Sequence, residues 1–104
     1  MAPKYANMTS IRSDRPDLDQ DAQAAVEAML PWLRQFDGYE GLIVLTDGDS
    51  GRAHFVTFWE DEDALKRSAQ GRQQVREQMA KTAGAEIESS QPYVVRVVDG
   101  LEQA

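Results

Sequence analysis

The stretch VTFWEDEDALKRSA, from Val56 to Ala69, changes from a strand-like to a helix-like pattern. β-favouring residues end at Trp59, and the four acids that follow are typical of a first helical turn, where they complement the helix dipole. A helix is therefore predicted from about Asp61 to Lys81, with a break near Gly71, since glycine costs about 1 kcal/mol relative to alanine inside a helix. Trp59 either lines a pocket for a flat ligand or fills the corner of the core.

The sequence just before this helix predicts a β-hairpin. Apolar runs over 39–46 and 53–59 flank the turn-forming sequence DGDSG, whose glycines can adopt a positive φ. An earlier strand is predicted over 4–11. Between them, apolar side chains three and four apart predict an amphipathic helix over 18–36, which Pro31 should kink or split.

The C-terminal part predicts the last strand. Residues 86–98 are extended in pattern, with YVVRVV at 93–98 the clearest strand and Pro92 marking an edge, a bulge or a bend. The order of elements predicts an α+β, ferredoxin-like βαββαβ fold. Such a fold is a four-stranded antiparallel sheet with two helices on one face, here a single domain over 1–104.

The predicted strands do not alternate as strands with one wet face should. Apolar residues are consecutive over 42–45 and nearly so over 55–59 and 94–98. Two helices can cover only one face of the sheet, so the other face needs a second subunit. A twofold homodimer is the simplest prediction, with a ligand enclosed between the two sheets.

Two segments, PWLRQFDGYEGLIVL and VTFWEDEDAL, resemble the antibiotic biosynthesis monooxygenase-like family of dimeric α/β barrels. The resemblance extends over Tyr5 to Val98, with the Gly38-Tyr39 turn and the Trp59-Glu60-Asp61-Glu62 strand end as its clearest features. It implies a monooxygenase that needs no cofactor and acts on an aromatic polyketide- or quinol-like molecule, whose carbanion reduces oxygen directly. The haem-degrading branch pairs a strand-one Asn, matched by Asn7, with a helical iron-ligating His that this chain lacks.

Six residues are candidates for the site: Asn7 and His54 as catalytic groups, and Tyr5, Thr9, Trp59 and Arg96 as substrate contacts. Tyr5, Asn7 and Thr9 lie two apart and would share one face of a strand. Asn7 would hydrogen-bond a carbonyl or an activated oxygen, or else a neighbouring backbone group or solvent.

The remaining candidates have structural alternatives. His54 is the only histidine and could remove a phenolic proton, but its place beside the DGDSGR turn also suits a surface residue. Arg96 could bind a carboxylate or phenolate, or pair with an acid at a dimer interface.

A non-enzymatic homodimer is the alternative function, one that binds a small apolar molecule or has a filled, purely structural interior. The net charge of −7 argues against nucleic acid and against an anionic membrane surface as partners. The acids at 60–63 are interpreted as helix caps, so no metal site is predicted. With no cysteine, no signal sequence and no membrane-length apolar run, a cytoplasmic protein is expected.

Overall fold

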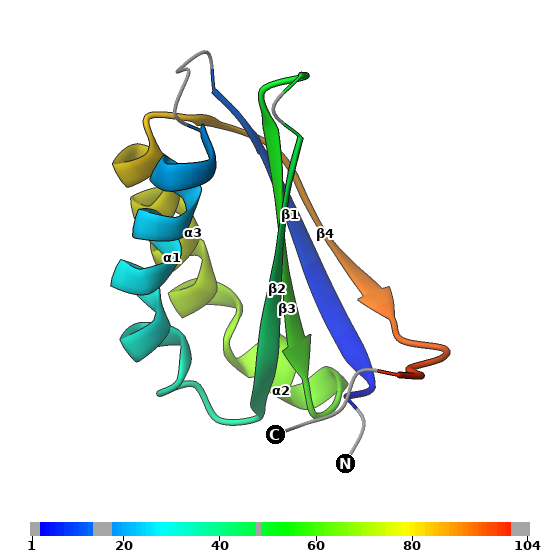
Figure 1. The fold of residues 1–104 in the computed structure, drawn as a ribbon. Coiled ribbons are helices and arrows are strands. Elements are labelled where there is room, and N and C mark those ends of the chain that lie inside the picture. The colour runs from blue at the N-terminus through cyan, green and yellow to red at the C-terminus, as the bar shows by residue number, and fades with distance from the viewer. Residues whose placement is uncertain (1–2, 14–17, 48, 101–104) are drawn as a thin grey trace.

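The structure is a computed structural model that describes residues 3–13, 18–47 and 49–100. Four strands form one antiparallel sheet in the order β2-β3-β1-β4, and the helices lie on one face of it (Figure 1). The elements are β1 (Tyr5–Arg12), α1 (Leu18–Leu33), β2 (Tyr39–Asp47), β3 (Arg52–Trp59), α2 (Glu62–Arg67), α3 (Ala69–Ala83) and β4 (Glu86–Val94). The predicted ferredoxin-like fold and the β2–β3 hairpin are confirmed.

The strand register decides which side chains meet the helices. Asn7 pairs with Thr57 and Thr9 with Phe55, so the odd-numbered residues of β1 and β3 share the helix-covered face. Ile11 and Phe55 are buried there against α1 and α3. The core side chains that complete this layer are Ala22, Ala25, Met29, Leu33, Ala53, Val75, Met79 and Ala80.

The second helical region is divided, but not where glycine predicted. α2 ends at Arg67 and is capped by Ser68, whose backbone N–H donates to the carbonyl of Ala64, and α3 begins at Ala69. Gly71 lies inside α3. The residue is a glycine for a packing reason, because a Cβ there would stand 2.7 Å from the ring of Phe36. The predicted capping role of the acids is confirmed at Asp61, whose Oδ1 accepts from the backbone N–H of Ala64 at 2.8 Å.

Helix α1 differs from its prediction at its end. It runs without a split to Leu33, so Pro31 lies in the last turn and the predicted extension to Phe36 is wrong. A proline removes one backbone hydrogen bond to the preceding turn, but the helix continues past this loss, since the N–H of Arg34 donates to the carbonyl of Leu30 at 2.9 Å. Gly38 then turns the chain into β2 with φ of +84°.

Strand β4 lies earlier in the chain than predicted. Its last pairs are Tyr93 with Ala6 and Val94 with Tyr5, where β1 begins. The N–H of Val95 still donates to the carbonyl of Lys4 at 2.9 Å, but no strand in the described part of the chain pairs with 96–98, and Val97 is 82% exposed. Pro92 is tolerated because β4 is an edge strand, as its sequence suggested.

The other face of the sheet carries a row of apolar side chains that no described helix covers. Met8, Ile43, Val56 and Phe58 are half-buried on this open face, and Leu45 and Tyr93 are exposed. Figure 1 shows all three helices on the opposite side. No helix in the described part of the chain is long and apolar enough to cross a membrane.

Candidate functional site

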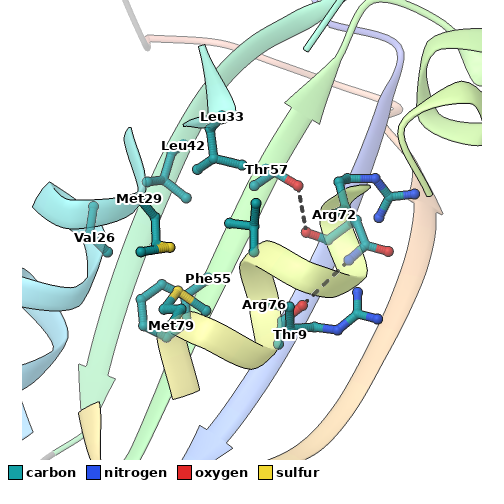
Figure 2. A pocket seen from close by; sticks show the side chains of 12 residues that line it. Thr9, Val26, Met29, Leu33, Leu42, Phe55, Thr57, Arg72, Arg76 and Met79 are labelled. Atoms are coloured by element: carbon teal, nitrogen blue, oxygen red, sulfur yellow. Dashed lines mark hydrogen bonds between the residues drawn. The ribbon is translucent and has the colours of Figure 1, made fainter. Parts of the chain in front are cut away.

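A cavity of about 40 Å³ lies between the sheet and the helices. The sequence predicted a ligand enclosed between two sheets, so this cavity is on the opposite face of the sheet from the one expected. Its walls change character from one end to the other (Figure 2). Val26, Met29, Leu42, Phe55, Val75 and Met79 form the apolar end, and Asn7, Thr9, Arg72 and Arg76 form the polar end.

The polar end is built on Ser90 of β4, which three neighbours contact. Asn7 Nδ2 donates to Ser90 Oγ at 3.0 Å, and Arg76 Nη1 donates to it at 3.1 Å. A hydroxyl oxygen has two acceptor positions. The Ser90 proton is therefore left to bond Thr9 Oγ1, which lies 3.0 Å away. Thr9 Oγ1 is therefore the acceptor in its bond with Ser90, and the Thr9 hydroxyl proton can be donated to another group.

Arg72 lies one helical turn before Arg76 and is held firmly. Its Nε donates to Ser68 Oγ and its Nη2 to the carbonyl of Leu65, both at 2.8 Å. Its guanidinium stands 5.4 Å from the centre of the Trp59 ring, a cation–π contact. Burial, with the nearby charge of Arg76, holds the pKa of Arg72 below its usual value.

No carboxylate in the described part of the chain forms an ion pair with either Arg72 or Arg76. The ion pairs of the described residues join Arg52 to Glu88, Lys66 to Glu62 and Arg67 to Asp37. The polar end of the cavity therefore has two positive charges and, apart from Asn7 Oδ1, mostly hydrogen-bond donors.

Trp59 is fully buried, with 0% of its surface exposed. Its indole N–H donates to Thr57 Oγ1 at 2.9 Å, and its ring packs on Phe36 and Tyr39. It lines neither the cavity nor the neighbouring groove. In this structure Trp59 fills the corner behind Arg72, which covers the face where a flat ligand would stack.

A groove of about 400 Å³ opens to solvent between α2, α3 and β4. Tyr5, Leu65 and Pro92 supply apolar surface, and Asn7 and Arg72 line this groove as well as the cavity. These two side chains therefore separate the two spaces. Small-molecule sites are typically about 300–1,000 Å³. A ligand of that size would need the groove, with its end reaching the cavity.

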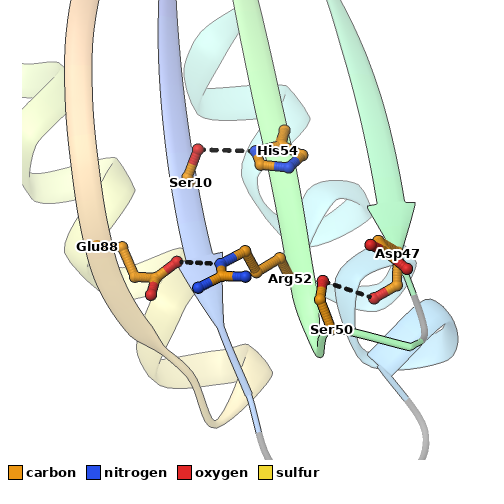
Figure 3. Close-up of polar contacts among 6 residues, drawn as sticks. All are labelled: Ser10, Asp47, Ser50, Arg52, His54 and Glu88. Carbon is orange, nitrogen blue, oxygen red and sulfur yellow. Dashed lines mark hydrogen bonds and ion pairs between the residues drawn. The ribbon is translucent and has the colours of Figure 1, made fainter.

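His54 and Arg96 lie away from this cavity. His54 is on the open face of the sheet, where its Nδ1 lies 2.7 Å from Ser10 Oγ (Figure 3). Arg96 follows the end of β4 and is exposed. Asn7 and Thr9 are brought together in the cavity and Tyr5 in the groove, whereas His54 does not share a site with Asn7 within one chain.

Arg72, Arg76 and Ser90 were missed by the sequence reasoning, although a signal for the arginines existed. Positions 65, 68, 72, 75 and 79 repeat at three and four, so Arg72 interrupts the inward stripe of the helices. Arg72 and Arg76 are four residues apart, and they lie beside the inward positions Val75 and Met79. This spacing indicates that arginine side chains face the protein interior. The apolar members of that stripe predict the helix but not these charged side chains.

No protein-family model and no curated protein matches the sequence. Solved structures do match it. A monooxygenase from the gene ActVA-Orf6 of Streptomyces coelicolor, in complex with nanaomycin D, has a TM-score of 0.66 and 14% identity, over 98% of this chain and 94% of that one. The chain has the antibiotic biosynthesis monooxygenase fold.

Two further structures extend the comparison. SnoaB, a cofactor-independent oxygenase from Streptomyces nogalater, has a TM-score of 0.63 and 11% identity, over 98% of this chain and 100% of that one. A dimeric ferredoxin-like protein from an uncultured marine organism has a TM-score of 0.68 and 13% identity, over 93% and 99%. At these identities the likeness establishes the fold, and the resemblance inferred from the sequence is confirmed at that level.

Proposed function

We propose that the protein is a homodimeric, cofactor-independent monooxygenase that acts on an aromatic polyketide- or quinol-like molecule. The observation that supports it best is the polar cluster of Asn7, Thr9, Ser90 and Arg76 at one end of an otherwise apolar cavity. Preorganised donors in a partly dry site stabilise a developing oxyanion far better than water does. The oxygenases of the same fold from two Streptomyces species support the choice of chemistry.

The proposed reaction draws all its electrons from the substrate. A ring CH₂ that is conjugated with a carbonyl through an aromatic ring, as in an anthrone, loses a proton, the carbanion gives its electrons to O₂, and a C–O bond forms. Loss of water from the hydroperoxide then leaves a new carbonyl, so one oxygen atom enters the product and the other becomes water. In this scheme the Thr9 hydroxyl and the free N–H groups of Arg76 hold the enolate oxygen while the carbanion forms.

The proton needs a destination. The cavity-lining residues include no histidine, aspartate or glutamate, and His54 is on the other face of the sheet. The proposal therefore sends the proton to solvent through the groove. The positive charges of Arg72 and Arg76 favour ionisation by stabilising the anion that remains.

The homodimer is proposed from the open face of the sheet. Met8, Val56 and Phe58 lie on its central strands, with Ile43 beside them on β2. The ferredoxin-like protein of similar fold from an uncultured marine organism is dimeric, which supports a dimer here. Burying such a face twice by a twofold axis is a common way for a small domain to gain apolar burial.

Oxygen uptake with 1,8-dihydroxyanthrone and with a naphthohydroquinone tests the proposal, against the rate without protein. We expect catalysed uptake, one atom of ¹⁸O from ¹⁸O₂ in the anthraquinone formed from the anthrone, and at least about a tenfold loss in Thr9→Val, since one oxyanion donor contributes about that much or more. Trp32→Phe, which changes an exposed side chain, should react like the wild type. Uptake no faster than the protein-free rate with every substrate would reject the proposal.

One observation favours the alternative of a binding or structural homodimer. The cavity, with a volume of about 40 Å³, holds only a few water-sized groups. If the side chains of Asn7 and Arg72 do not move, the interior is nearly filled. Saturable quenching of Trp59 fluorescence in a Trp32→Phe background, without oxygen uptake, would select the binding function.

A further inference from the structure

Several hydrogen-bond donors at the polar end of the cavity make no hydrogen bond to an acceptor of the described residues. Ser90 uses its own proton on Thr9, while Asn7 and Arg76 both donate to Ser90. The Thr9 proton and several N–H groups of the two guanidiniums then have no acceptor among the described residues. Thr9 is only 5% exposed, and a buried hydroxyl donor without an acceptor costs free energy, so an acceptor bound beside Thr9 would be stabilising.

The positive charge at the polar end of the cavity also favours a bound hydrogen-bond acceptor. The whole chain carries a net charge of −7, yet Arg72 and Arg76 face the same space without an ion-paired carboxylate in the described ranges. Two like charges on one partly buried wall repel each other. The lowered pKa of Arg72 reports this, with burial as its main cause and Arg76 as the second. A bound anion would accept hydrogen bonds from the free donors and would reduce the repulsion between the two arginines.

The geometry defines what kind of anion fits. Residues four apart on a helix are neighbours on one face, so the two guanidiniums lie about one turn apart. Planar guanidinium groups match planar oxyanions, and Arg72 is already held in place by Ser68 and Leu65. Because Arg72 also lines the groove, an anion beside it would leave the rest of a ligand against Tyr5, Leu65 and Pro92.

We propose that Arg72 and Arg76 form an oxyanion-binding subsite, and that the ligand is a flat aromatic compound that carries a carboxylate or a phenolate. This inference rests on the proposed function in using the same pocket, and it adds the charge of the ligand. The apolar ring lies in the groove, and the oxyanion lies at the boundary between the groove and the cavity, near Thr9.

Isothermal titration calorimetry with a matched pair of probes tests the carboxylate. In the wild type, 2-naphthoate should bind roughly 10- to 100-fold more tightly than 2-naphthamide, because hydrogen bonds to a charged group contribute more than neutral ones. In Arg76→Gln the preference should fall to about threefold or less, because naphthoate loses more affinity than naphthamide when the charged donor is removed. Arg76→Lys should keep part of it, and Arg67→Gln, an exposed arginine of α2, should keep all of it.

A second probe tests the phenolate. The spectrum of 2-naphthol distinguishes phenol from phenolate, and bound naphthol should ionise at a lower pH than free naphthol in the wild type but not in Arg76→Gln. A naphthoate preference alone identifies a carboxylate ligand, and a naphthol shift alone identifies a phenolate. Neither effect in the wild type, or either one unchanged in Arg76→Gln, would overturn the proposal. Because no turnover is measured, failure of the oxygenase proposal and failure of this one are separate results.

Discussion

The two faces of the sheet are made from the same strands but have opposite character. On β1, Asn7 and Thr9 face the helices and form the donor-rich end of the cavity, while Met8 between them faces outward. On β3, Thr57 faces inward, and Val56 and Phe58 face outward. The covered face thus contains the proposed ligand site, and the open face is the proposed surface for assembly. Alternation along a strand lets each strand serve both purposes.

The largest effect should come from the covered face. Trp59→Ala removes a fully buried indole that packs on Phe36 and Tyr39, and we expect a loss of about 3–5 kcal/mol in the free energy of unfolding. Trp32→Ala is the matched control, because Trp32 is 63% exposed and should cost about 0.5 kcal/mol or less. Urea unfolding measures both. Similar losses in the two variants would contradict the assignment of Trp59 to the core.

The same alternation explains what the sequence could predict. Hydrophobic period, the DGDSG turn and the acids after Trp59 act locally, so the element order and the fold followed from them. The last strand was placed too late because its end depends on where β1 begins, which is a tertiary fact. The effects predicted for Pro31 and Gly71 were too large. Pro31 lies in the last turn of its helix, and Gly71 packs closely against Phe36 inside its helix.

The site was harder to predict, since it depends on register across strands. Asn7 pairs with Thr57, so His54 has the opposite parity and pairs with Ser10 on the open face. No local pattern reveals this parity, because a one-residue slip reverses every side chain. The arginines were missed for another reason. A helix assigned from its apolar stripe alone hides the charged residues within that stripe.

The second effect tests the open face. Phe58→Glu places like charges near each other across a twofold interface, which should cost several kcal/mol of association and convert a dimer into a monomer. Sedimentation velocity at micromolar concentration measures the mass, and circular dichroism should show that the fold is kept. Trp32→Glu, on an exposed site of α1, should stay dimeric. A wild-type protein that is already monomeric would remove the assembly half of the comparison.

A third effect, of about 1 kcal/mol, would sharpen the covered face. Asn7→Asp introduces a carboxylate beside Ser90 and Arg76, where we expect it to neutralise part of the excess positive charge. The melting temperature should rise by a few degrees while 2-naphthoate affinity falls at least about tenfold, since the site then contains its own anion. Thermal unfolding and calorimetry on one preparation measure both. A lower melting temperature together with unchanged naphthoate affinity would show that the two arginines do not need an anion.

The smallest effect lies in the ion pair at the end of the open face. Arg52 Nε donates to Glu88 at 2.8 Å (Figure 3), and this bond is the main cause of the lowered pKa of Glu88. A lowered carboxyl pKa stabilises the fold above the ordinary value of 4.5, and this contribution disappears as the pH falls through the folded-state pKa.

Glu88→Gln should therefore lower the melting temperature at pH 7 by only about 1–2 °C, with no difference from the wild type at a pH well below 4, because exposed ion pairs are screened by water and salt. Scanning calorimetry at both pH values, with and without added salt, measures it. A loss at pH 7 that salt does not reduce would mean that the pair is shielded from solvent, as it would be beneath a second subunit. The variant therefore reports how far the assembly surface extends beyond Phe58.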